Sequence, residues 1–419
     1  MQRRFLRIAL IAALLFAVAG AAVLLQQPGR AQTEAGRSES LATALEVMAL
    51  VHVYHVEDVD MFSLVRAYLQ KGTINGMLRE VLEDDYTRYM DRNAFARMQE
   101  DTVQGEFGGI GIVVGVRDGR LTIISPISGT PGFRAGLRGG DWILKVDGYE
   151  TEFMSQDEAV SMMRGPVGEP VVLTIQRGDE VWDVTIIREK IEVPSVERWT
   201  VITPDDVPHL AGPVGYIQLS NFNEKTMPQM NEALDRLLAA GIQGLILDLR
   251  NNGGGLLSTA LQLADRFIEN GPLVHVVSAN NQRRTYMAEE EGTFPSMPMV
   301  VLVNQYSASA SEIVAGALRD NGVAVLVGTQ TFGKGSVQTV LPLRGGAGLA
   351  LTTAHYETAG GHFIHGVGIT PDVIVEVPDE LLDTLYLSYD GGVNLDDVQL
   401  QKALEVLSDM MRARLSPAA

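Results

Sequence analysis

The 419-residue sequence contains no cysteine, which excludes disulfide bonds, zinc–thiolate sites and a cysteine nucleophile. Positive charge is also scarce, because 33 Lys and Arg face 52 Asp and Glu for a formal net charge of −19. Phosphate contacts need a surplus of basic side chains, so we expect no nucleic-acid partner. Histidine is limited to seven residues, none in a recognisable catalytic pattern. His52 and His55 have a spacing that could hold a metal, but without a third ligand we interpret them as structural.

Familiar enzyme motifs are also missing. A glycine-rich segment, 328–336, comes close to a phosphate-binding loop, but Gly335 stands where the loop needs a hydroxyl, and Pro342 argues against a following helix. Gly109 and Gly111 lack the third glycine of a dinucleotide fingerprint. There is no G-x-S-x-G and no H-E-x-x-H. Nucleotide enzymes, α/β-hydrolases and zincins are therefore disfavoured, and we expect no cofactor and no metal.

The composition is that of a globular protein, with 46% apolar and 20% charged residues, and the length suggests two to four domains. An uncharged apolar run, 8–25, follows Arg3, Arg4 and Arg7. This is the pattern of an export signal. Residues 1–30 are therefore predicted to be a signal peptide or membrane anchor, with the uncleaved anchor favoured. The rest of the chain is expected to be extracytoplasmic, in the periplasm or at the cell surface, and otherwise secreted.

Hydrophobic periodicity divides the remaining chain into five parts. After a small, polar linker, the spacing is first helical, then β-rich with one helix over 156–163, and then alternates between strands and helices. Such alternation indicates an α/β core with parallel pairing. The boundaries are 31–40 for the linker, 41–100 for the helical part, 101–190 for the β-rich part, 191–378 for the α/β core and 379–419 for the C-terminal segment, which ends in a helix over 396–412.

Two strand-to-helix turns in the α/β core carry residues suited to acyl chemistry. In the first, a buried strand breaks into a glycine run over 245–255, where backbone amides at a helix start can face an oxyanion. A tight turn alone would also explain this pattern. In the second, Ser309 and Glu312 form an S-x-x-E capping box, which is usually no more than an N-cap. The same placement puts the Ser309 hydroxyl at the positive end of a helix, beside the Ala310 amide.

Lys334 and Gln338 form a third feature. They lie four residues apart on an expected strand and therefore share one face. Burial of a lysine there would lower its pKa and allow it to act as a general base. A surface lysine is the simpler reading when this segment is taken alone.

Together and in this order, these segments resemble the carboxy-terminal processing proteases, a family of tail-specific Ser/Lys peptidases with a PDZ domain. The resemblance covers nearly the whole chain after the linker. It rests on segments with the sequences GTP at 129–131, AGL at 135–137, RGPVG at 164–168, DLRNNGGG at 248–255, SASASE at 307–312, GKGSVQ at 333–338 and GVGITPD at 366–372. Two departures, at 84–87 and 132–134, concern the helical part and the PDZ contacts.

The resemblance implies roles for individual residues. Ser309 is the nucleophile, Lys334 the general base and Gln338 the group that orients the lysine. Ala310 and Gly254 supply the oxyanion-hole amides. In the PDZ-like part, the backbone amides of residues 109–112 (Gly109, Ile110, Gly111 and Ile112) bind a substrate's C-terminal carboxylate, and the substrate tail adds as a strand. Arg164 belongs to the contact that couples the PDZ domain to the protease.

The implied architecture is a multidomain α/β protein with an N-terminal helical part, a PDZ domain, a crotonase-like protease core and a C-terminal helical segment. The implied function is a serine endopeptidase that cleaves exported proteins near or from unstructured, apolar C-terminal tails. A homodimer and an activating partner protein are further expectations. Two alternatives stay open: a catalytically silent PDZ scaffold that captures C-termini, and an acyl-CoA-handling enzyme on the same core fold.

Overall fold

The computed structural model describes residues 40–84, 86–117, 120–127, 129–154, 156–192, 194–279, 282–289, 294–378 and 393–415. The predicted export signal over 1–30, nearly all of the linker over 31–40, and part of the C-terminal segment lie outside these residues. Within the described residues, no helix has both the length and the apolar character needed to span a membrane. The chain divides into two compact units, which are described separately below.

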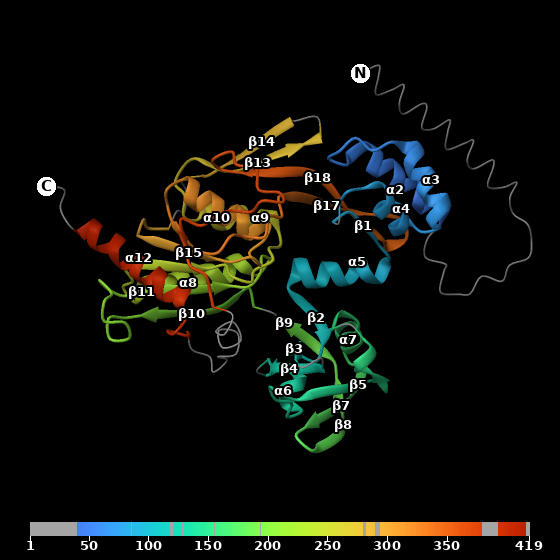
Figure 1. The fold of residues 1–419 in the computed structure, drawn as a ribbon, viewed down its shortest axis with the longest axis horizontal. Helices are drawn as coiled ribbons and strands as arrows, with labels where there is room; N and C mark the ends of the chain where they lie inside the picture. Colours follow the sequence, from blue (N-terminus) through green and yellow to red (C-terminus); the bar gives the residue numbers. More distant parts are fainter. Residues whose placement is uncertain are drawn as a thin grey trace, which may run out of the picture. The chain divides into compact units, whose positions relative to one another are not determined.

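The first unit is built on three N-terminal helices (blue in Figure 1). Each helix begins at a side chain that caps a backbone N–H, as expected for Ser, Asp and Thr at this position: Ser40, Asp60 and Thr73. The unit also includes residues 337–355, which the sequence analysis had assigned to the protease core. The elements are α2 (Leu41–Tyr54), α3 (Met61–Lys71), α4 (Ile74–Val81), β1 (Arg88–Met90) and most of β17 (Ser336–Pro342) and β18 (Gly348–Thr358).

A single apolar cluster holds this unit together. Val47, Met77 and Leu78 of the helices pack with Leu349 and Leu351 of β18, and all five are almost fully buried. Strand β1 pairs antiparallel with β18. The strands β1 and β18 were not anticipated, because 41–100 was expected to be helical throughout and no strand was placed at 348–358.

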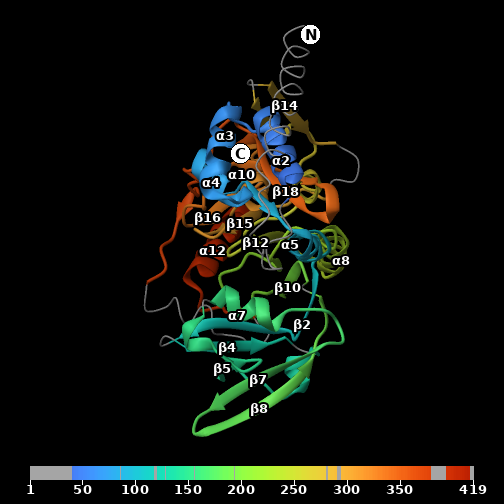
Figure 2. The ribbon, with the colours of Figure 1, turned by 90° about the vertical axis from the view of Figure 1, so that its right-hand side faces the viewer.

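The second unit begins at Ala96 and contains the β-rich part. Its strands form one antiparallel sheet in the order β3-β4-β5-β7-β8 and a separate β2–β9 pair. Figure 2 shows α7 lying along the sheet, where it contacts β3 and β5. The elements are β2 (Glu106–Gly109), β3 (Ile112–Arg117), β4 (Arg120–Pro126), α6 (Pro131–Arg134), β5 (Trp142–Val146), β6 (Tyr149–Glu150), α7 (Gln156–Met163), β7 (Pro170–Arg177), β8 (Glu180–Ile187) and β9 (Glu189–Glu192). Helix α5 (Arg92–Met98) and a π-helical stretch (Gln99–Gln104) precede them.

The same unit contains the α/β core, a six-stranded sheet in the order β10-β11-β12-β15-β16-β19. All neighbouring strands are parallel except β10 and β11. The elements are β10 (Val196–Ile202), β11 (Val214–Leu219), α8 (Thr226–Ala239), β12 (Gly244–Asp248), α9 (Leu257–Asp265), β15 (Met299–Val303), α10 (Ala310–Asp320), β16 (Val325–Gly328), β19 (Val373–Ile374) and α12 (Val398–Leu415). Two further strands, β13 (Pro272–Ser278) and β14 (Gln282–Met287), lie between α9 and β15 in the chain and pair with each other outside this sheet.

Both faces of this sheet are covered, which explains why every residue of β12 and β15 is buried and why β15 is apolar throughout. Ile246, Val300 and Leu302 pack against Leu404 and Leu407 of α12, which runs beside the sheet (red in Figure 1). Compared with the sequence-based boundaries, α12 begins at Val398 rather than Asp396. The alternation of strands and helices predicted for the core is confirmed.

Candidate active site

Three loops at the carboxyl edge of the parallel sheet carry the predicted catalytic residues of the core. Gly254 follows β12, Ser309 follows β15, and Lys334 follows β16. These strands are neighbours, and Asp248 pairs with Leu302, which in turn pairs with Val327. Because parallel strands end at the same edge, side chains far apart in sequence meet here, at the usual ligand-binding edge of an open α/β sheet.

Ser309 is the N-cap of α10, as predicted, but its backbone is unusual for a cap. Its φ of 56° and ψ of −112° lie outside the extended region that N-cap residues normally occupy. Such a conformation costs about 1–3 kcal/mol for a residue with a side chain, and it persists only where the surroundings impose it. Nucleophilic serines of other hydrolases sit on a similarly strained strand-to-helix turn that exposes Oγ. Ser309 is half-buried.

Glu312 joins the loop that carries Ser309, the predicted nucleophile, to the loop that carries Lys334. These two loops are called the nucleophile loop and the lysine loop below. Its Oε2 accepts hydrogen bonds from the backbone N–H groups of Ser309 and Lys334, both at 2.9 Å. Its Oε1 accepts from Thr331 Oγ1 at 2.6 Å and from the Gly333 N–H at 2.8 Å. Burial raises the pKa of Glu312, although the four donors favour its ionised form and oppose that shift. A single buried carboxylate thus sets the distance between the two backbone segments that carry Ser309 and Lys334.

The glycine loop packs directly on Ser309. A Cβ on Gly254 would lie 2.7 Å from Ala308 O and 2.9 Å from both Ala310 N and Ser309 Cβ, so only glycine fits this position. The φ of Gly254 is also positive, at 98°. Its N–H donates to Oδ1 of the fully buried Asn252 at 2.9 Å. The structure therefore brings Gly254 beside Ser309 and Ala310, with its amide engaged by a side chain of its own loop.

The lysine loop is held from its other side by the chain segment 364–369. The Gly366 N–H donates to Gly333 O at 2.9 Å, and the Thr331 N–H donates to Ile369 O at 3.1 Å. The Phe332 N–H donates to Ser307 O at 3.1 Å, which adds a direct bond to the nucleophile loop. Lys334 is half-buried, rather than exposed as in the alternative reading. Strand β17 begins at Ser336, so Lys334 lies in the loop before the strand and not, as expected, on the same strand as Gln338.

Gln338 lies in the first compact unit, within a buried polar chain. Its Nε2 donates to Thr352 Oγ1 at 3.4 Å, the Thr352 N–H donates to Thr87 Oγ1 at 3.0 Å, and the Thr87 hydroxyl bonds Asp84. Asp84 is 3.4 Å from His55 Nε2. Burial of Asp84 opposes its ionisation, but the hydrogen bonds from His55, Thr352, Thr87 and the Tyr86 N–H hold its pKa well below its usual value of 3.8.

The histidines singled out in the sequence have local partners. His55 Nδ1 accepts from the Glu57 N–H at 3.1 Å, which leaves Nε2 as the protonated nitrogen facing Asp84. His52 Nδ1 lies 2.7 Å from Val59 O. Among the residues that the structure describes, no group of three His, Asp or Glu side chains is placed to hold a metal ion.

The predicted carboxylate-binding residues form the turn between β2 and β3. Ile110 O accepts from the Gly132 N–H at 2.7 Å, and Gly111 O accepts from the Ile127 N–H and from Thr130 Oγ1 at 2.9 and 2.8 Å. In a trans peptide the N–H points away from the preceding carbonyl, so the amides of Gly111 and Ile112 point away from the segment 127–132. Strand β3, which follows, is an edge strand of its sheet.

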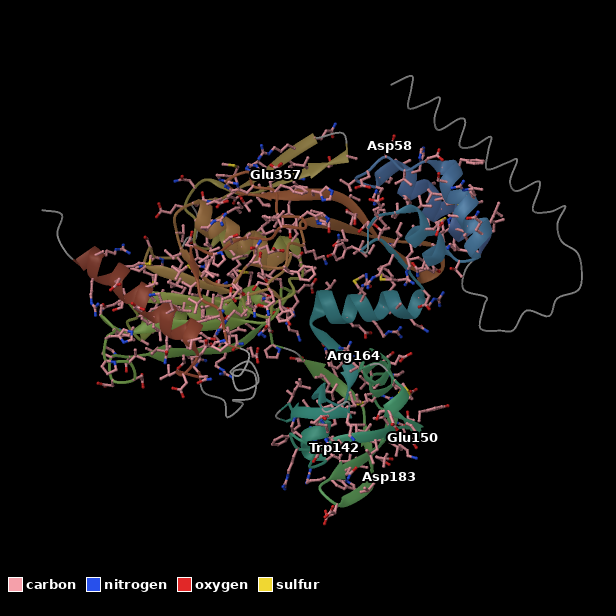
Figure 3. The ribbon with its side chains drawn as sticks, in the orientation of Figure 1. Asp58, Trp142, Glu150, Arg164, Asp183 and Glu357 are labelled. Carbon is pink, nitrogen blue, oxygen red and sulfur yellow. The ribbon has the colours of Figure 1, made fainter. Side chains whose placement is uncertain are left out.

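Arg164, labelled in Figure 3, follows α7 within the β-rich part. Its guanidinium carbon lies 4.1 Å from the ring centroid of Phe107 in β2, a cation–π contact. The contact fixes Arg164 close to the turn 109–112, because Gly109 follows Phe107 by two residues.

The structure brings together the loops of Ser309, Lys334 and Gly254, which the sequence predicted, but the sequence indicated only a capping role for Glu312. The capping box predicted the hydrogen bond from the Ser309 N–H to the Glu312 side chain, and the structure contains this bond. The bonds to Thr331, Gly333 and Lys334 join segments about twenty residues apart in the chain, so no local pattern indicated them. Asn252 was passed over as part of the glycine run, although its position between β12 and the glycines was visible.

Comparison with known proteins identifies the family of the chain. The peptidase family S41 model matches residues 213–375, and a PDZ-domain model matches residues 122–177. A carboxy-terminal-processing protease of Bartonella bacilliformis is 40% identical over 340 residues, which cover 80% of this chain and 74% of that protein. A carboxy-terminal processing protease of Bacillus subtilis is 37% identical over 344 residues, covering 80% of this chain and 72% of the relative.

Among solved structures, the photosystem II D1 C-terminal processing protease matches with a TM-score of 0.57 and 29% sequence identity, covering 80% of this chain and 92% of the other. The fold and the family match define the class: this is a serine-type peptidase with a PDZ domain and an α/β core. The predicted multidomain architecture is confirmed. The chain belongs to the carboxy-terminal processing proteases of peptidase family S41.

Proposed function

We propose that this serine peptidase cleaves exported proteins near or from their C-terminal tails by a Ser309/Lys334 mechanism. The observation that carries the proposal is the strained backbone of Ser309 at the start of α10, tied through Glu312 to the backbone of Lys334. A strained serine at the positive end of a helix, held beside a half-buried lysine loop, suits nucleophilic catalysis and is costly for a mere cap.

In this mechanism Lys334 Nζ is neutral at the start and takes the proton from Ser309 Oγ as the oxygen attacks the carbonyl carbon of the scissile bond. The tetrahedral intermediate collapses, the C–N bond breaks, and the proton passes from Lys334 to the leaving amine. Water then attacks the acyl-enzyme and gives a proton to Lys334. The lysine returns this proton to Ser309 Oγ as the N-terminal fragment leaves with its new C-terminal carboxyl group. Gln338 orients the lysine in this proposal.

The oxyanion that forms in both steps is stabilised by the amides of Ala310 and Gly254. The contact distances around Gly254 support this assignment, since its backbone packs against Ala310 N and Ser309 Cβ. For Gly254 to donate to the oxyanion, the substrate must replace Oδ1 of Asn252 as its acceptor. A rotation of the peptide group between Gly253 and Gly254 would turn the Gly254 N–H towards the oxyanion when substrate binds.

The PDZ domain binds the apolar C-terminal tail of the substrate. The outward amides of Gly111 and Ile112 are suited to the terminal carboxylate, and the free edge of β3 is suited to an added strand. Arg164, fixed against Phe107, couples this domain to the protease. We place the enzyme outside the cytoplasm and anchor it to the membrane through residues 1–30.

A homodimer is part of the proposal. Phe62 and Leu69 are 73% and 80% exposed and lie seven residues apart on α3, so they share one face of the helix. Large apolar side chains so exposed on one helix face favour burial against a second copy. An activating partner protein completes the set of proposed partners.

The test compares the whole chain with its Ser309→Ala variant. Each is incubated with an unstructured protein that ends in an apolar tail and with the same protein ending in a charged tail, with EDTA present. Cleavage that requires Ser309 and prefers the apolar tail supports the proposal and excludes a metal requirement. Tail binding without cleavage by either form favours the catalytically silent scaffold or an enzyme that still needs its activating partner. Cleavage that survives Ser309→Ala shows that another residue is the nucleophile.

A further inference from the structure

Arg250 lies immediately before the glycine loop and is enclosed by acidic side chains from two distant parts of the core. Its Nη2 is 2.6 Å from Asp248 Oδ2, and its Nη1 is 2.6 Å from Asp397 Oδ2. The side chains of Arg250, Asp248 and Asp397 are 14%, 2% and 8% exposed. Charges this far from water are weakly screened, and removing one partner leaves the others uncompensated.

Asp397 also caps the start of the C-terminal helix α12. Its Oδ1 accepts from the backbone N–H groups of Gln399 and Leu400, at 2.9 and 3.2 Å. The Gln399 side chain reinforces the arrangement, because its Oε1 accepts from Arg250 Nη1 at 3.1 Å and its Nε2 donates to Val375 O at 2.8 Å. One carboxylate therefore caps α12 and binds Arg250 at the same time.

Beyond Arg250, the loop is bonded directly to the nucleophile loop. Asn251, with a φ of 60°, exchanges two hydrogen bonds with the Asn304 amide, at 3.0 and 2.9 Å. Asn252 O accepts from the Ala308 N–H at 3.0 Å and from Ser311 Oγ at 2.8 Å. A shift of Arg250 would move residues 251–254, and with them the amide of Gly254 relative to Ser309.

We infer that Asp397 is a positioning residue: its ion pair with Arg250 holds the glycine loop in register with Ser309 and makes docking of α12 part of active-site assembly. The inference deepens the proposed function and rests on the oxyanion role of Gly254. The C-terminal segment thus does more than cover one face of the sheet, because its first residues support the loop that binds the oxyanion.

The test variant is Asp397→Asn, which keeps an oxygen for the cap, since Asn is as good an N-cap as Asp, and removes the charge that binds Arg250. Asp396→Asn is the matched control: Asp396 is the exposed neighbour, and the substitution removes the same charge at the same helix start. Both variants and the wild type are assayed for kcat and KM on the protein with the apolar tail, and for Tm.

We expect Asp397→Asn to lower kcat about tenfold or more with KM within about twofold, because oxyanion donors act in the transition state rather than in substrate binding. Asp396→Asn should match the wild type. Amide hydrogen exchange of residues 249–254 should be faster in Asp397→Asn than in Asp396→Asn, while exchange in β11 stays the same. A purely structural Asp397 would instead lower Tm and raise exchange throughout the core.

Unchanged kcat in Asp397→Asn, or a uniform rise in exchange across the core, overturns the inference. The exchange measurement needs no turnover. A wild type that cleaves nothing is the silent scaffold or still needs its activating partner, and in either case the exchange of residues 249–254 decides whether Asp397 positions the loop.

Discussion

Glu312→Gln perturbs the link between the loops of Ser309 and Lys334 with little change in shape. The Glu312 carboxylate accepts four hydrogen bonds, two at each oxygen. A Gln side chain keeps one oxygen and presents an NH₂ group at the other position. Its best placement turns the NH₂ towards Thr331, whose hydroxyl also accepts, and keeps the oxygen on the N–H groups of Ser309 and Lys334. The Gly333 N–H then faces a second donor.

The size of the effect follows from these contacts. An orphaned buried N–H costs about 1–3 kcal/mol, and the two remaining bonds lose the strength that an ionised acceptor provides. Loss of the buried charge offsets part of this, because burial raises the pKa of Glu312. We expect the free energy of unfolding to fall by about 1–2 kcal/mol. The effect on kcat should be larger, about tenfold to a hundredfold, because a shift of about 1 Å between reacting groups has that consequence.

The assay measures kcat and KM on the protein with the apolar tail, and the free energy of unfolding in urea. Leu234→Ala is the control: Leu234 of α8 is fully buried, and the substitution should cost about 2–5 kcal/mol by leaving a cavity. At a temperature well below both melting points, the control should keep its kcat. A Glu312→Gln variant with kcat within twofold of the wild type would refute the positioning role of Glu312.

The pH dependence supplies an independent check. Because the pKa of Glu312 in the folded state is raised above its ordinary value of 4.5, its contribution to stability is greatest below that pH and is lost as pH rises through the folded value. The wild type should therefore gain stability relative to Glu312→Gln as pH falls from 7 towards 4.5. If the difference in free energy of unfolding between the two proteins stays constant over this pH range, the pKa of Glu312 is not raised.

Three further predictions follow from other contacts. Gly254→Ala should lower kcat by a hundredfold or so, because its Cβ would meet the backbone of the nucleophile loop; Gly241→Ala, which also has positive φ but open space, should leave kcat unchanged. Asp84→Asn should lower the free energy of unfolding by about 1–3 kcal/mol at pH 7. Since the pKa of Asp84 is lowered, urea unfolding should show this difference shrinking as pH falls below 3.8. Replacing Phe62 and Leu69 together by Glu should give a monomer in light scattering, and a mass unchanged from the wild type would count against the α3 interface.

Local sequence patterns predicted much of the core because its strands are buried on both faces and read as continuous apolar runs. The runs over β12 and β15, followed by a glycine loop and a capping serine, placed the two strand-to-helix turns correctly. Strand β18, with the sequence GLALTTAHYET, was not predicted, because it is buried at most positions and therefore lacks a clear apolar–polar alternation. The assignment of residues 337–355 to the N-terminal unit depends on contacts between segments more than 250 positions apart, which no periodicity reveals.

The sequence by itself determined the residue types that the proposed chemistry needs and their order: a serine before a helix, a lysine followed four residues later by a glutamine, and glycines after a buried strand. These are local properties, because capping, strand alternation and glycine turns act within a few residues. Only the tertiary structure decided that the Glu312 carboxylate accepts hydrogen bonds from the backbone N–H groups of both Ser309 and Lys334. It also decided that Asp397 binds Arg250 and that Gly254 packs on Ser309. Each of these contacts joins chain segments that come together only when parallel strands end at a common edge, and their hydrogen-bond directions depend on packing that has no local signature.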